Sequence, residues 1–413
     1  MRRSICAVVA AVLALAFSTA AYADNSGRIH GKITTVDGDV FVGLIRWDKN
    51  EASWIDILHG NKEMTRDSKR RHNKKKYYKK KSIKIFGIPI GHSTSYSYDY
   101  GASQSGMRFG HIKAIEAIDD DAALIILKSG LKVELESGSS DVGDAIRELI
   151  IEDVNEGEIE FDWEDLEMVE LSQGDADLDS YYGERLYGTL TTDRGDEFTG
   201  WVCWDVDELF TGDVLDGEQK HRNRKVKFGK IAAIERHNSG AALVIMKNGE
   251  DMVLRGTNDV NDSNRGIVIS EYGSGQIVVD WDEFERLEFK QPPAPERYAD
   301  FDGGHRLSGT VFTEDGEEFT GWIRWDDDEE YSWEILDGEY RGVEFDIEFG
   351  NIKALERKGS RSSIVTLWDG RTYRLRGTND VDDDNKGIFI EMENGDEEEI
   401  DWYDLDKVEF SKR

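Results

Sequence analysis

Acidic side chains in a repeated, glycine-led loop are the first residues of this chain whose types and spacing could do chemistry. Residues 380–387 read D-V-D-D-D-N-K-G, and the equivalent residues 259–266 read D-V-N-D-S-N-R-G. Alternating oxygen-bearing side chains can surround Ca²⁺, which binds six to eight oxygens. Glu391 lies eleven residues after Asp380, where a bidentate ligand would close the loop. This pattern predicts calcium binding through Asp380, Asp382, Asp384, Glu391, Asp259 and Asn261.

An alternative reading of the same loops is purely structural. Asp and Asn side chains often accept hydrogen bonds from the backbone two residues on, which forms an Asx turn without any ion. The equivalent loop near residue 140 keeps only two of the acids, Asp141 and Asp144. After the loop at residues 259–266, the position equivalent to Glu391 is occupied by Ser270. Both interpretations stay open at this point, and calcium is the one cofactor that the sequence suggests.

A basic segment at residues 69–84 is the second candidate site. It holds ten Lys or Arg and no acidic residue, in a chain whose formal net charge is -34. So acidic a chain is a poor general binder of nucleic acid, whereas this segment suits an anionic partner. The anion-binding candidates are Lys69, Arg70, Arg71, Lys74, Lys75, Lys76, Lys79, Lys80, Lys81 and Lys84.

Two kinds of partner fit that segment, and a third interpretation needs none. The first is an anionic component of the cell envelope, such as lipopolysaccharide, anionic lipid headgroups or released nucleic acid. The second is the acidic body of the same or another copy, which would give head-to-tail self-assembly. The third possibility is a solvated run of charge with no partner. We expect the envelope partner, with a self-assembling structural surface protein as the alternative.

Catalysis is not expected. None of the eight histidines occupies an equivalent place in all the repeats described below, and the common nucleophile and phosphate-binding motifs are absent. A polysaccharide hydrolase is the least favoured alternative, since it would need two carboxyls with separated pKa values. Cys203 lies between Trp201 and Trp204 in a strand-like run, which is typical of a packed strand residue rather than a nucleophile.

These candidates are positioned by a unit written three times. Four signatures recur in the same order in each unit. The first ends in F-x-G-x-x-x-W-D, the second is F-G-x-I-x-A-[IL]-E, the third is the acidic loop and the fourth is D-W-x-[DE]-[LF]-x-x-[VL]-E. Residues 185–290 and 306–411 align without a gap and share 44 identities over 106 positions. The expected organisation is a cleaved signal peptide (1–23), repeat one (28–171) with a basic insertion (about 60–106), a linker (172–184), repeat two (185–290), a proline-containing linker (291–305) and repeat three (306–411).

The repeats read as β-structure throughout. Short runs of apolar and β-branched residues alternate with glycine-containing turns, and helix-length periodicity is absent. Residues 226–235 and 279–288 share one pattern, in which an aromatic residue and two apolar residues spaced by three precede Glu. This resembles small SH3-like or Sm-like barrels, where one helical turn precedes the last strand. We therefore expect an all-β chain of three barrel-like or sandwich-like repeats, each built from two such halves.

Tryptophans at equivalent positions are expected in the cores rather than on a carbohydrate-stacking surface. These are Trp47, Trp204 and Trp325, and Trp163, Trp281 and Trp402. Trp54, Trp333 and Trp368 are not shared by all repeats, so we expect them to be exposed.

The N-terminus predicts export. It has a basic start, an apolar run from Ile5 to Phe17 and an Ala-x-Ala exit at Ala23, which together are typical of a secretory signal. No later stretch is long and apolar enough to suggest a membrane span. The sequence as a whole therefore predicts a non-catalytic repeat protein, periplasmic or extracellular, that binds an anionic envelope partner.

Overall fold

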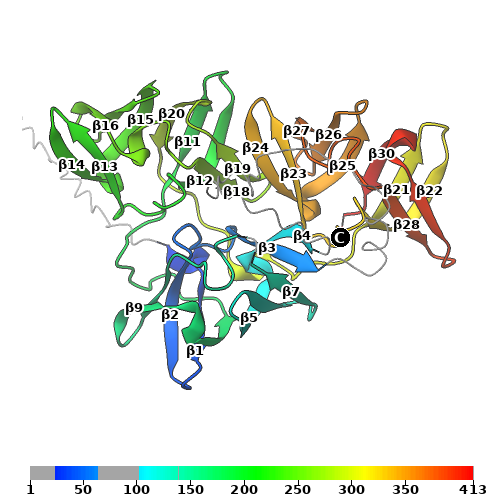
Figure 1. The fold of residues 1–413 in the computed structure, drawn as a ribbon, viewed down its shortest axis with the longest axis horizontal. Helices are drawn as coiled ribbons and strands as arrows, with labels where there is room; N and C mark the ends of the chain where they lie inside the picture. The colour runs from blue at the N-terminus through cyan, green and yellow to red at the C-terminus, as the bar shows by residue number, and fades with distance from the viewer. Residues whose placement is uncertain (1–23, 64–101, 138, 413) are drawn as a thin grey trace, which may run out of the picture.

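The computed structural model describes residues 24–63, 102–137 and 139–412 (Figure 1). Within these residues the chain forms thirty strands and eight short 3-10 helices, with no α-helix. The all-β prediction is therefore confirmed. No helix in the described part of the chain is long and apolar enough to cross a membrane.

Every repeat contributes ten strands in the same order. The helix η1 (Asn25–Gly27) directly precedes the first repeat. The first repeat contains β1 (His30–Thr35), β2 (Val40–Trp47), β3 (Ile57–Glu63), β4 (Ala102–Arg108), η2 (Phe109–His111), β5 (Ile112–Asp119), β6 (Ala122–Leu127), β7 (Lys132–Glu136), β8 (Leu149–Asp153), β9 (Gly157–Phe161), η3 (Trp163–Asp165) and β10 (Leu166–Leu171).

The other two repeats follow the same plan. The second contains β11 (Tyr187–Thr192), β12 (Glu197–Cys203), β13 (Val214–Gln219), β14 (Arg222–Lys227), η4 (Phe228–Lys230), β15 (Ile231–Asn238), β16 (Ala241–Met246), β17 (Asp251–Arg255), η5 (Asn258–Val260), β18 (Ile267–Glu271), β19 (Gly275–Val279) and β20 (Phe284–Phe289). The segment before the third repeat contains η6 (Tyr298–Asp300). The third repeat contains β21 (Ser308–Thr313), β22 (Glu318–Arg324), β23 (Ile335–Tyr340), β24 (Val343–Glu348), η7 (Phe349–Asn351), β25 (Ile352–Arg357), β26 (Ser362–Leu367), β27 (Thr372–Arg376), β28 (Ile388–Met392), β29 (Glu397–Ile400), η8 (Trp402–Asp404) and β30 (Leu405–Phe410).

The strands of the first repeat form one antiparallel sheet in the order β4-β3-β7-β6-β5-β10-β1-β2-β8-β9. The strands of repeats two and three pair in the same pattern, within a single twenty-stranded sheet. Neither sheet closes on itself in the described part of the chain, so the expected closure into barrels is not observed. The end strands of the first sheet, β4 and β9, pair on one side only, and a closed barrel would leave no such edge.

Each repeat consists of two five-stranded halves that are interleaved along the chain. One half of the first repeat is the continuous run β3 to β7, whereas the other takes β1 and β2 from before it and β8 to β10 from after it. The chain therefore crosses between the halves twice, after β2 and after β7. A 3-10 helix precedes β5 in one half and β10 in the other, so the halves also match in detail.

Glycine sets the tight turn that precedes each Trp-Asp strand. Gly195 has φ +79°, a conformation that costs an L residue, and no atom lies within 4 Å of the place where a Cβ would sit. The turn brings β11 and β12 into antiparallel register, with Gly188 opposite Gly200. These short hairpins deliver the Trp-Asp pair to the point where the chain leaves the half.

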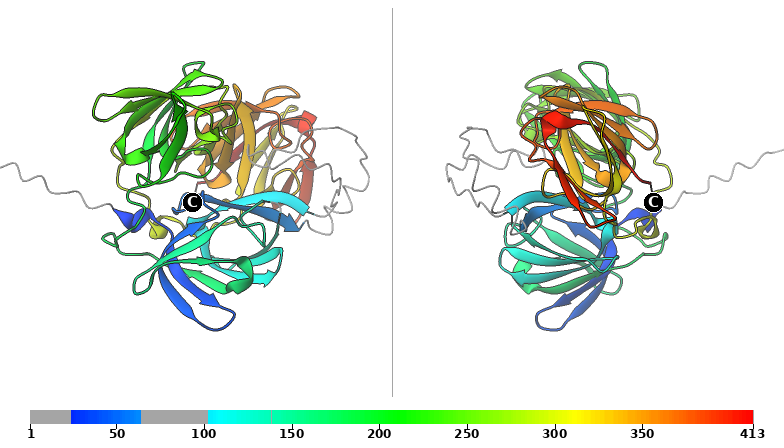
Figure 2. Two further views of the ribbon diagram at one scale, coloured as in Figure 1. Left: turned by 60° about the vertical axis from the view of Figure 1, so that its left-hand side comes forward. Right: turned by 90° about the vertical axis from the view of Figure 1, so that its right-hand side faces the viewer.

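Repeats two and three lie side by side and the first repeat packs beneath them (Figures 1 and 2). The upper pair is joined by strand pairing between β19 and β24. The segment between repeats two and three rests on the first repeat, since a Cβ on Gly27 would come within 2.3 Å of the Pro295 Cβ. Trp54 packs on Tyr298 of this segment, with ring centroids 4.6 Å apart.

The cores bury the tryptophans that recur in all repeats. Trp47, Trp204 and Trp325 are fully buried, as are Trp163, Trp281 and Trp402 to within 3%. The prediction of exposure is wrong for Trp54 and Trp333, which are 0% and 1% exposed. Both are covered by contacts between repeats, and a Cβ on Gly304 would come within 2.3 Å of the Trp333 ring. Trp368 is half-buried.

Candidate functional site

The predicted anion-binding residues, 69–84, lie outside the described residues. The structure does describe the two strands from which this insertion departs. Glu63 at the end of β3 faces Ala102 at the start of β4 in the antiparallel register. The equivalent hairpin of the second repeat closes directly from Gln219 to Arg222. The insertion therefore replaces a two-residue hairpin turn.

The predicted calcium ligands of the third repeat are not gathered at one point. Asp380 is buried and accepts a hydrogen bond from the Asp337 backbone N–H at 2.9 Å. Asp382 accepts one from the Asp384 N–H at 3.0 Å, which is the Asx turn of the alternative interpretation. Glu391 lies on β28, exposed, and forms an ion pair with Arg306 at 3.1 Å.

The same division holds in the second repeat. Asp259 is buried and accepts a hydrogen bond from the Asp216 N–H at 2.6 Å. Asn261 accepts one from the Ser263 N–H at 2.8 Å. In both repeats the first acid of the loop points inward and the following residues cap their own turn.

What the structure does bring together is a set of three carboxyls in each repeat, all buried except the half-buried Glu208, which we call the carboxylate clusters. Each contains the Asp of the Trp-Asp pair, a Glu three residues later and the first acid of the acidic loop. They are Asp48, Glu51 and Asp141; Asp205, Glu208 and Asp259; and Asp326, Glu329 and Asp380. Because these residues come from the loops after β2 and β7 and their equivalents, each cluster lies where the chain crosses between halves.

The tryptophan before each cluster fixes the acidic loop in place. Its indole N–H donates to the backbone carbonyl of the loop acid, at 2.8 Å from Trp47 to Asp141, 2.9 Å from Trp204 to Asp259 and 3.0 Å from Trp325 to Asp380. Buried indole N–H groups are generally hydrogen-bonded, and here this bond ties one crossing loop to the other.

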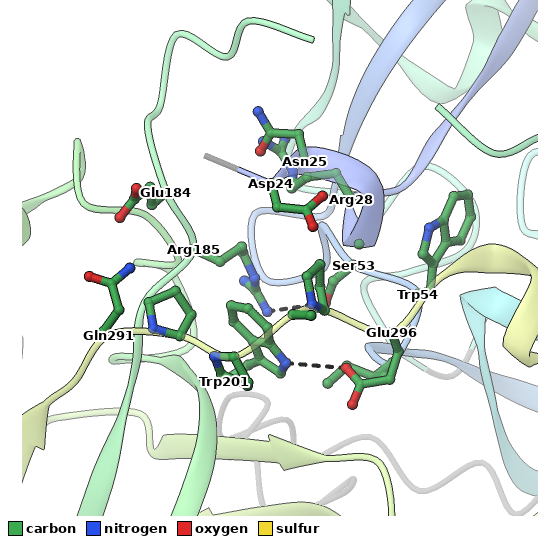
Figure 3. Close-up of a pocket in the computed structure, with 16 residues that line it drawn as sticks. Asp24, Asn25, Arg28, Ser53, Trp54, Glu184, Arg185, Trp201, Gln291 and Glu296 are labelled. Atoms are coloured by element: carbon green, nitrogen blue, oxygen red, sulfur yellow. Dashed lines mark hydrogen bonds between the residues drawn. The ribbon is translucent and has the colours of Figure 1, made fainter. Parts of the chain in front are cut away.

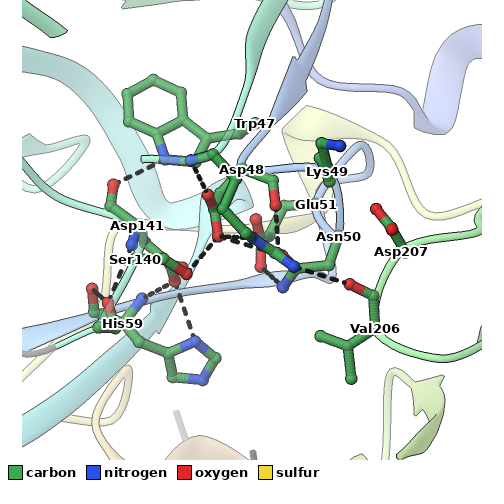
Figure 4. A network of polar contacts seen from close by, with 12 residues as sticks. Trp47, Asp48, Lys49, Asn50, Glu51, His59, Ser140, Asp141, Val206 and Asp207 are labelled. Atoms are coloured by element: carbon green, nitrogen blue, oxygen red, sulfur yellow. Dashed lines mark hydrogen bonds and ion pairs between the residues drawn. The ribbon is translucent and has the colours of Figure 1, made fainter. Parts of the chain in front are cut away.

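The first Asp of each cluster holds the other end of the acidic loop. Asp205 accepts the Arg265 backbone N–H at 2.6 Å, pairs with the Arg265 guanidinium at 3.0 Å and accepts from the Asn258 amide. Arg147 with Ser140 and Lys386 with Asn379 fill these roles in the other repeats. Figure 4 shows the first-repeat network, in which Arg147 also donates to the Val206 carbonyl of repeat two at 3.2 Å.

Each cluster has more carboxyl groups than basic groups, and burial makes the ionised form of these carboxyls unfavourable. Burial together with nearby Asp259 and Asp207 raises the pKa of Glu208 to about 10, and burial raises the pKa of Asp259 to about 6. Burial and neighbouring acids likewise raise the pKa values of Glu51 and Glu329 well above the ordinary range. At neutral pH the carboxyls of Glu208, Glu51 and Glu329 hold protons unless a cation replaces them.

Two groups of described residues have ligand atoms close enough for one metal ion. They are Glu51, His59 and Asp141, and Asp326, Glu329 and Asp380, with the ligand atoms of each group within 4.8 Å of one another. Glu329 is only 8% exposed, and its Oε2 atom is buried without a hydrogen-bond partner. Oxygen ligands of this kind suit a hard cation such as Ca²⁺.

The chain matches no protein-family model and no curated protein.

Sequence reasoning found the loop acids Asp259 and Asp380 but missed their buried partners. The missed signal is a W-D-x-x-E spacing, which occurs at residues 47–51, 204–208 and 325–329. Three acidic residues brought to one place by two different loops cannot be recognised from either loop alone.

A cavity of about 200 Å³ lies between repeats one and two and the proline segment (Figure 3). Arg185 enters it from repeat two and pairs with Asp56 of repeat one at 3.0 Å. Trp201 forms another wall and donates its indole N–H to Glu296 at 3.4 Å. The cavity is thus a seam between packed units, in which Nη2 of Arg185 is paired while its Nε and Nη1 are buried without a hydrogen-bond partner.

Cys203 matches its predicted role as a packed strand residue. Its side chain is 5% exposed, and burial raises the pKa of the thiol well above the ordinary value. A thiol held in its protonated form is a weak nucleophile.

Proposed function

We propose that this protein is a non-catalytic, exported repeat protein that binds an anionic partner of the cell envelope through residues 69–84. The observation that carries the proposal is the position of the insertion. Three equivalent hairpins exist, and only the β3–β4 hairpin carries the basic segment, while β13–β14 and β23–β24 close in tight turns.

The charge of the chain supports a binding role for that segment. The remainder of the protein is acidic, so a basic segment stands out as the attractive surface for polyanions. Glu63 and Ala102 face one another across the hairpin, so the chain leaves and returns at one point. Removal of the insertion should therefore leave the sheet intact.

The test replaces residues 64–101 with the Arg341-Gly342 turn of the third repeat. Vesicles of phosphatidylglycerol and lipopolysaccharide micelles are the two probes, each across a salt series, because counterion release makes such binding salt-sensitive. We expect the intact chain to bind at low salt and dissociate at high salt, while the shortened chain melts at the same temperature and does not bind. Equal binding by both chains would disprove the proposal. A third variant with all ten basic residues changed to Gln separates charge from length.

A second proposal concerns calcium. We propose Asp326, Glu329 and Asp380 as the ligands in repeat three, in place of the ligand set predicted from the loop alone. The supporting observation is the unpartnered Glu329 Oε2 within a group of buried acids. Lys386 already pairs with Asp326 at 3.3 Å, so the ion would have to compete with this ammonium group.

Calorimetric titration with Ca²⁺ tests this assignment. We expect heat from the intact chain, none from the Glu329→Gln variant, and an unchanged signal from Glu391→Gln, whose carboxylate pairs with Arg306. Absence of heat from the intact chain, or loss only in Glu391→Gln, would overturn the assignment.

We also propose that each repeat derives from two SH3-like halves. The support is that each half has five strands, and that a 3-10 helix directly precedes β5 in one half and β10 in the other, the two strands that pair where the halves meet.

A further inference from the structure

The junction between repeats two and three is made by one end strand of each repeat. β19 pairs with β24 in antiparallel register, with Gln276 opposite Asp346, Ile277 opposite Phe345 and Val278 opposite Glu344. Within their own repeats these strands pair only with β18 and β23, respectively. The chain therefore already contains one working example of edge-to-edge addition.

The same two strand positions occur again at the far ends of this sheet. β14 is the second repeat's counterpart of β24, and β29 is the third repeat's counterpart of β19. Among the described strands β14 pairs with β13 alone and β29 with β28 alone. Figure 1 shows β14 at one end of the upper layer and β28, the neighbour of β29, toward the other.

The two free edges carry opposite charge. β14 reads R-N-R-K-V-K, and all of its residues except Val226 are exposed. β29 reads E-E-E-I, and its three glutamates are exposed. Charged edges normally keep sheets from pairing with copies of themselves, because like edges repel. A basic edge and an acidic edge on one molecule repel their own kind but attract each other.

The register of the internal junction would place opposite charges across from one another at two of its three positions. Because repeats two and three align without a gap, the junction register transfers directly to β29 and β14. It places Glu397 opposite Lys225, Glu398 opposite Arg224 and Glu399 opposite Asn223. Opposite charges directly across an antiparallel pair are favourable, and like charges there are unfavourable.

We propose that β29 of one copy pairs with β14 of a second copy, in the register of the β19–β24 junction. The contact joins two different surfaces, so each added copy leaves a fresh β14 and a fresh β29 at the ends. Such a head-to-tail contact propagates into a filament or closes into a ring. The twenty-stranded sheet would then continue from copy to copy.

Existing contacts of these side chains do not oppose this pairing. Lys225 lies 3.7 Å from Asp216, and Glu397 lies 3.3 Å from Arg324, in both cases with at least one well-exposed partner. Exposed ion pairs contribute little and exchange readily. The inference goes beyond the proposed function, because it uses neither the basic insertion nor an envelope partner.

Charge reversal gives a test with internal rescue. Variant A carries Arg224→Glu and Lys225→Glu, and variant B carries Glu397→Lys and Glu398→Lys. Sedimentation velocity at low salt should show the intact chain assembling with concentration. Each variant alone should need an at least roughly tenfold higher concentration, since two attractive pairs become repulsive. An equimolar mixture of A and B should assemble again, because each supplies the edge that the other needs.

Two controls keep the result interpretable. Lys113→Glu with Lys132→Glu changes the net charge as variant A does, on exposed residues of the first repeat, and should assemble like the intact chain. The whole series is repeated in the chain with residues 64–101 replaced by a turn, which removes assembly through the basic segment. A monomeric intact chain at every concentration, or variants that assemble unchanged, would refute the proposal.

Discussion

The β19–β24 junction and the free edges β14 and β29 occupy equivalent backbone positions, yet their side chains differ completely. Every residue of β19 is buried, and Phe345 of β24 packs edge-on against Phe198 with ring centroids 5.6 Å apart. At the free edges the same positions carry arginine, lysine and glutamate. A joint centred on the apolar pair Ile277 and Phe345 stays formed within the chain, whereas a joint made by exposed charges depends on salt and concentration.

The comparison separates what the backbone decides from what the side chains decide. The strand order makes both ends of each repeat capable of edge pairing. The residues at those ends then determine whether the edge is joined inside the molecule or left for another one. Three changes test how far this separation holds.

The largest effect is expected when the junction receives the side chain of the free edge. Phe345 is fully buried, and its counterpart in β14 is Arg224. Phe345→Arg removes the aromatic packing and buries a charge without a partner, so we expect a loss of about 4 kcal/mol in the free energy of unfolding. Urea unfolding followed by tryptophan fluorescence measures this loss.

The reverse exchange is its control. Arg224→Phe makes the free edge resemble the junction, so stability should hold while solubility falls. If Phe345→Arg leaves the unfolding midpoint unchanged, the junction does not depend on its apolar side chains.

A smaller effect is expected from a methyl group placed between the two strands of the junction. Gly275 has φ +82°, and a Cβ there would meet the Asp346 carbonyl oxygen at 2.0 Å. Gly395, in the turn before β29, has φ +84° but no atom within 4 Å of its Cβ position. Gly395→Ala should therefore cost about 1 kcal/mol from backbone strain alone, and Gly275→Ala about 3 kcal/mol because the strands must separate.

Thermal melting of the two glycine variants distinguishes strain from collision. Equal melting temperatures would mean that β19 and β24 yield at this point, and the junction would then be softer than its packing indicates.

The smallest effect is a dependence of the junction on pH. Burial, followed by the charges of Asp337 and Glu344, raises the pKa of Asp346 well above its ordinary value. The folded state thus keeps a proton that the unfolded chain loses above about pH 4. Stability from this group is fully present below that pH and declines as pH rises toward the raised pKa.

Melting temperatures between pH 4 and pH 8 test this point. Asp346→Asn should flatten the decline, while Glu399→Gln on the exposed edge should leave the slope of the monomer unchanged. An identical slope in the Asp346→Asn variant would assign the pH dependence to other buried acids, such as Glu208.

The sequence predicted the features that repeat within one unit. The all-β class followed from the alternation of apolar residues, and the buried Trp204 and Trp325 followed from their equivalent positions. The prediction failed for Trp54 and Trp333, since both pack against residues outside their own repeat, Tyr298 and Gly304, and no pattern within one repeat records such contacts. The interleaving of the halves could not be predicted from the sequence either, because the turn motifs do not show which distant strand completes each half.

The candidate site was predicted in part for a similar reason. Asp380 was singled out correctly as a loop acid, but its companions Asp326 and Glu329 lie more than fifty residues earlier in the chain. Glu391 was predicted as a ligand from its spacing alone, but it lies on a strand where it forms an ion pair with Arg306. Spacing rules describe a continuous loop, and here the acids meet through two crossings of the chain.

The interleaved halves also constrain the order in which the strands can pair as the protein folds. Gly31 near the start of the first repeat pairs with Leu171 at its end, and β21 likewise pairs with β30. As the chain is synthesised, the first strand of each repeat cannot complete its pairing until the last strand of that repeat has been made. Pairing over such separations makes folding slow, and a chain cut a few residues short would leave β21 and β25 without the strand between them.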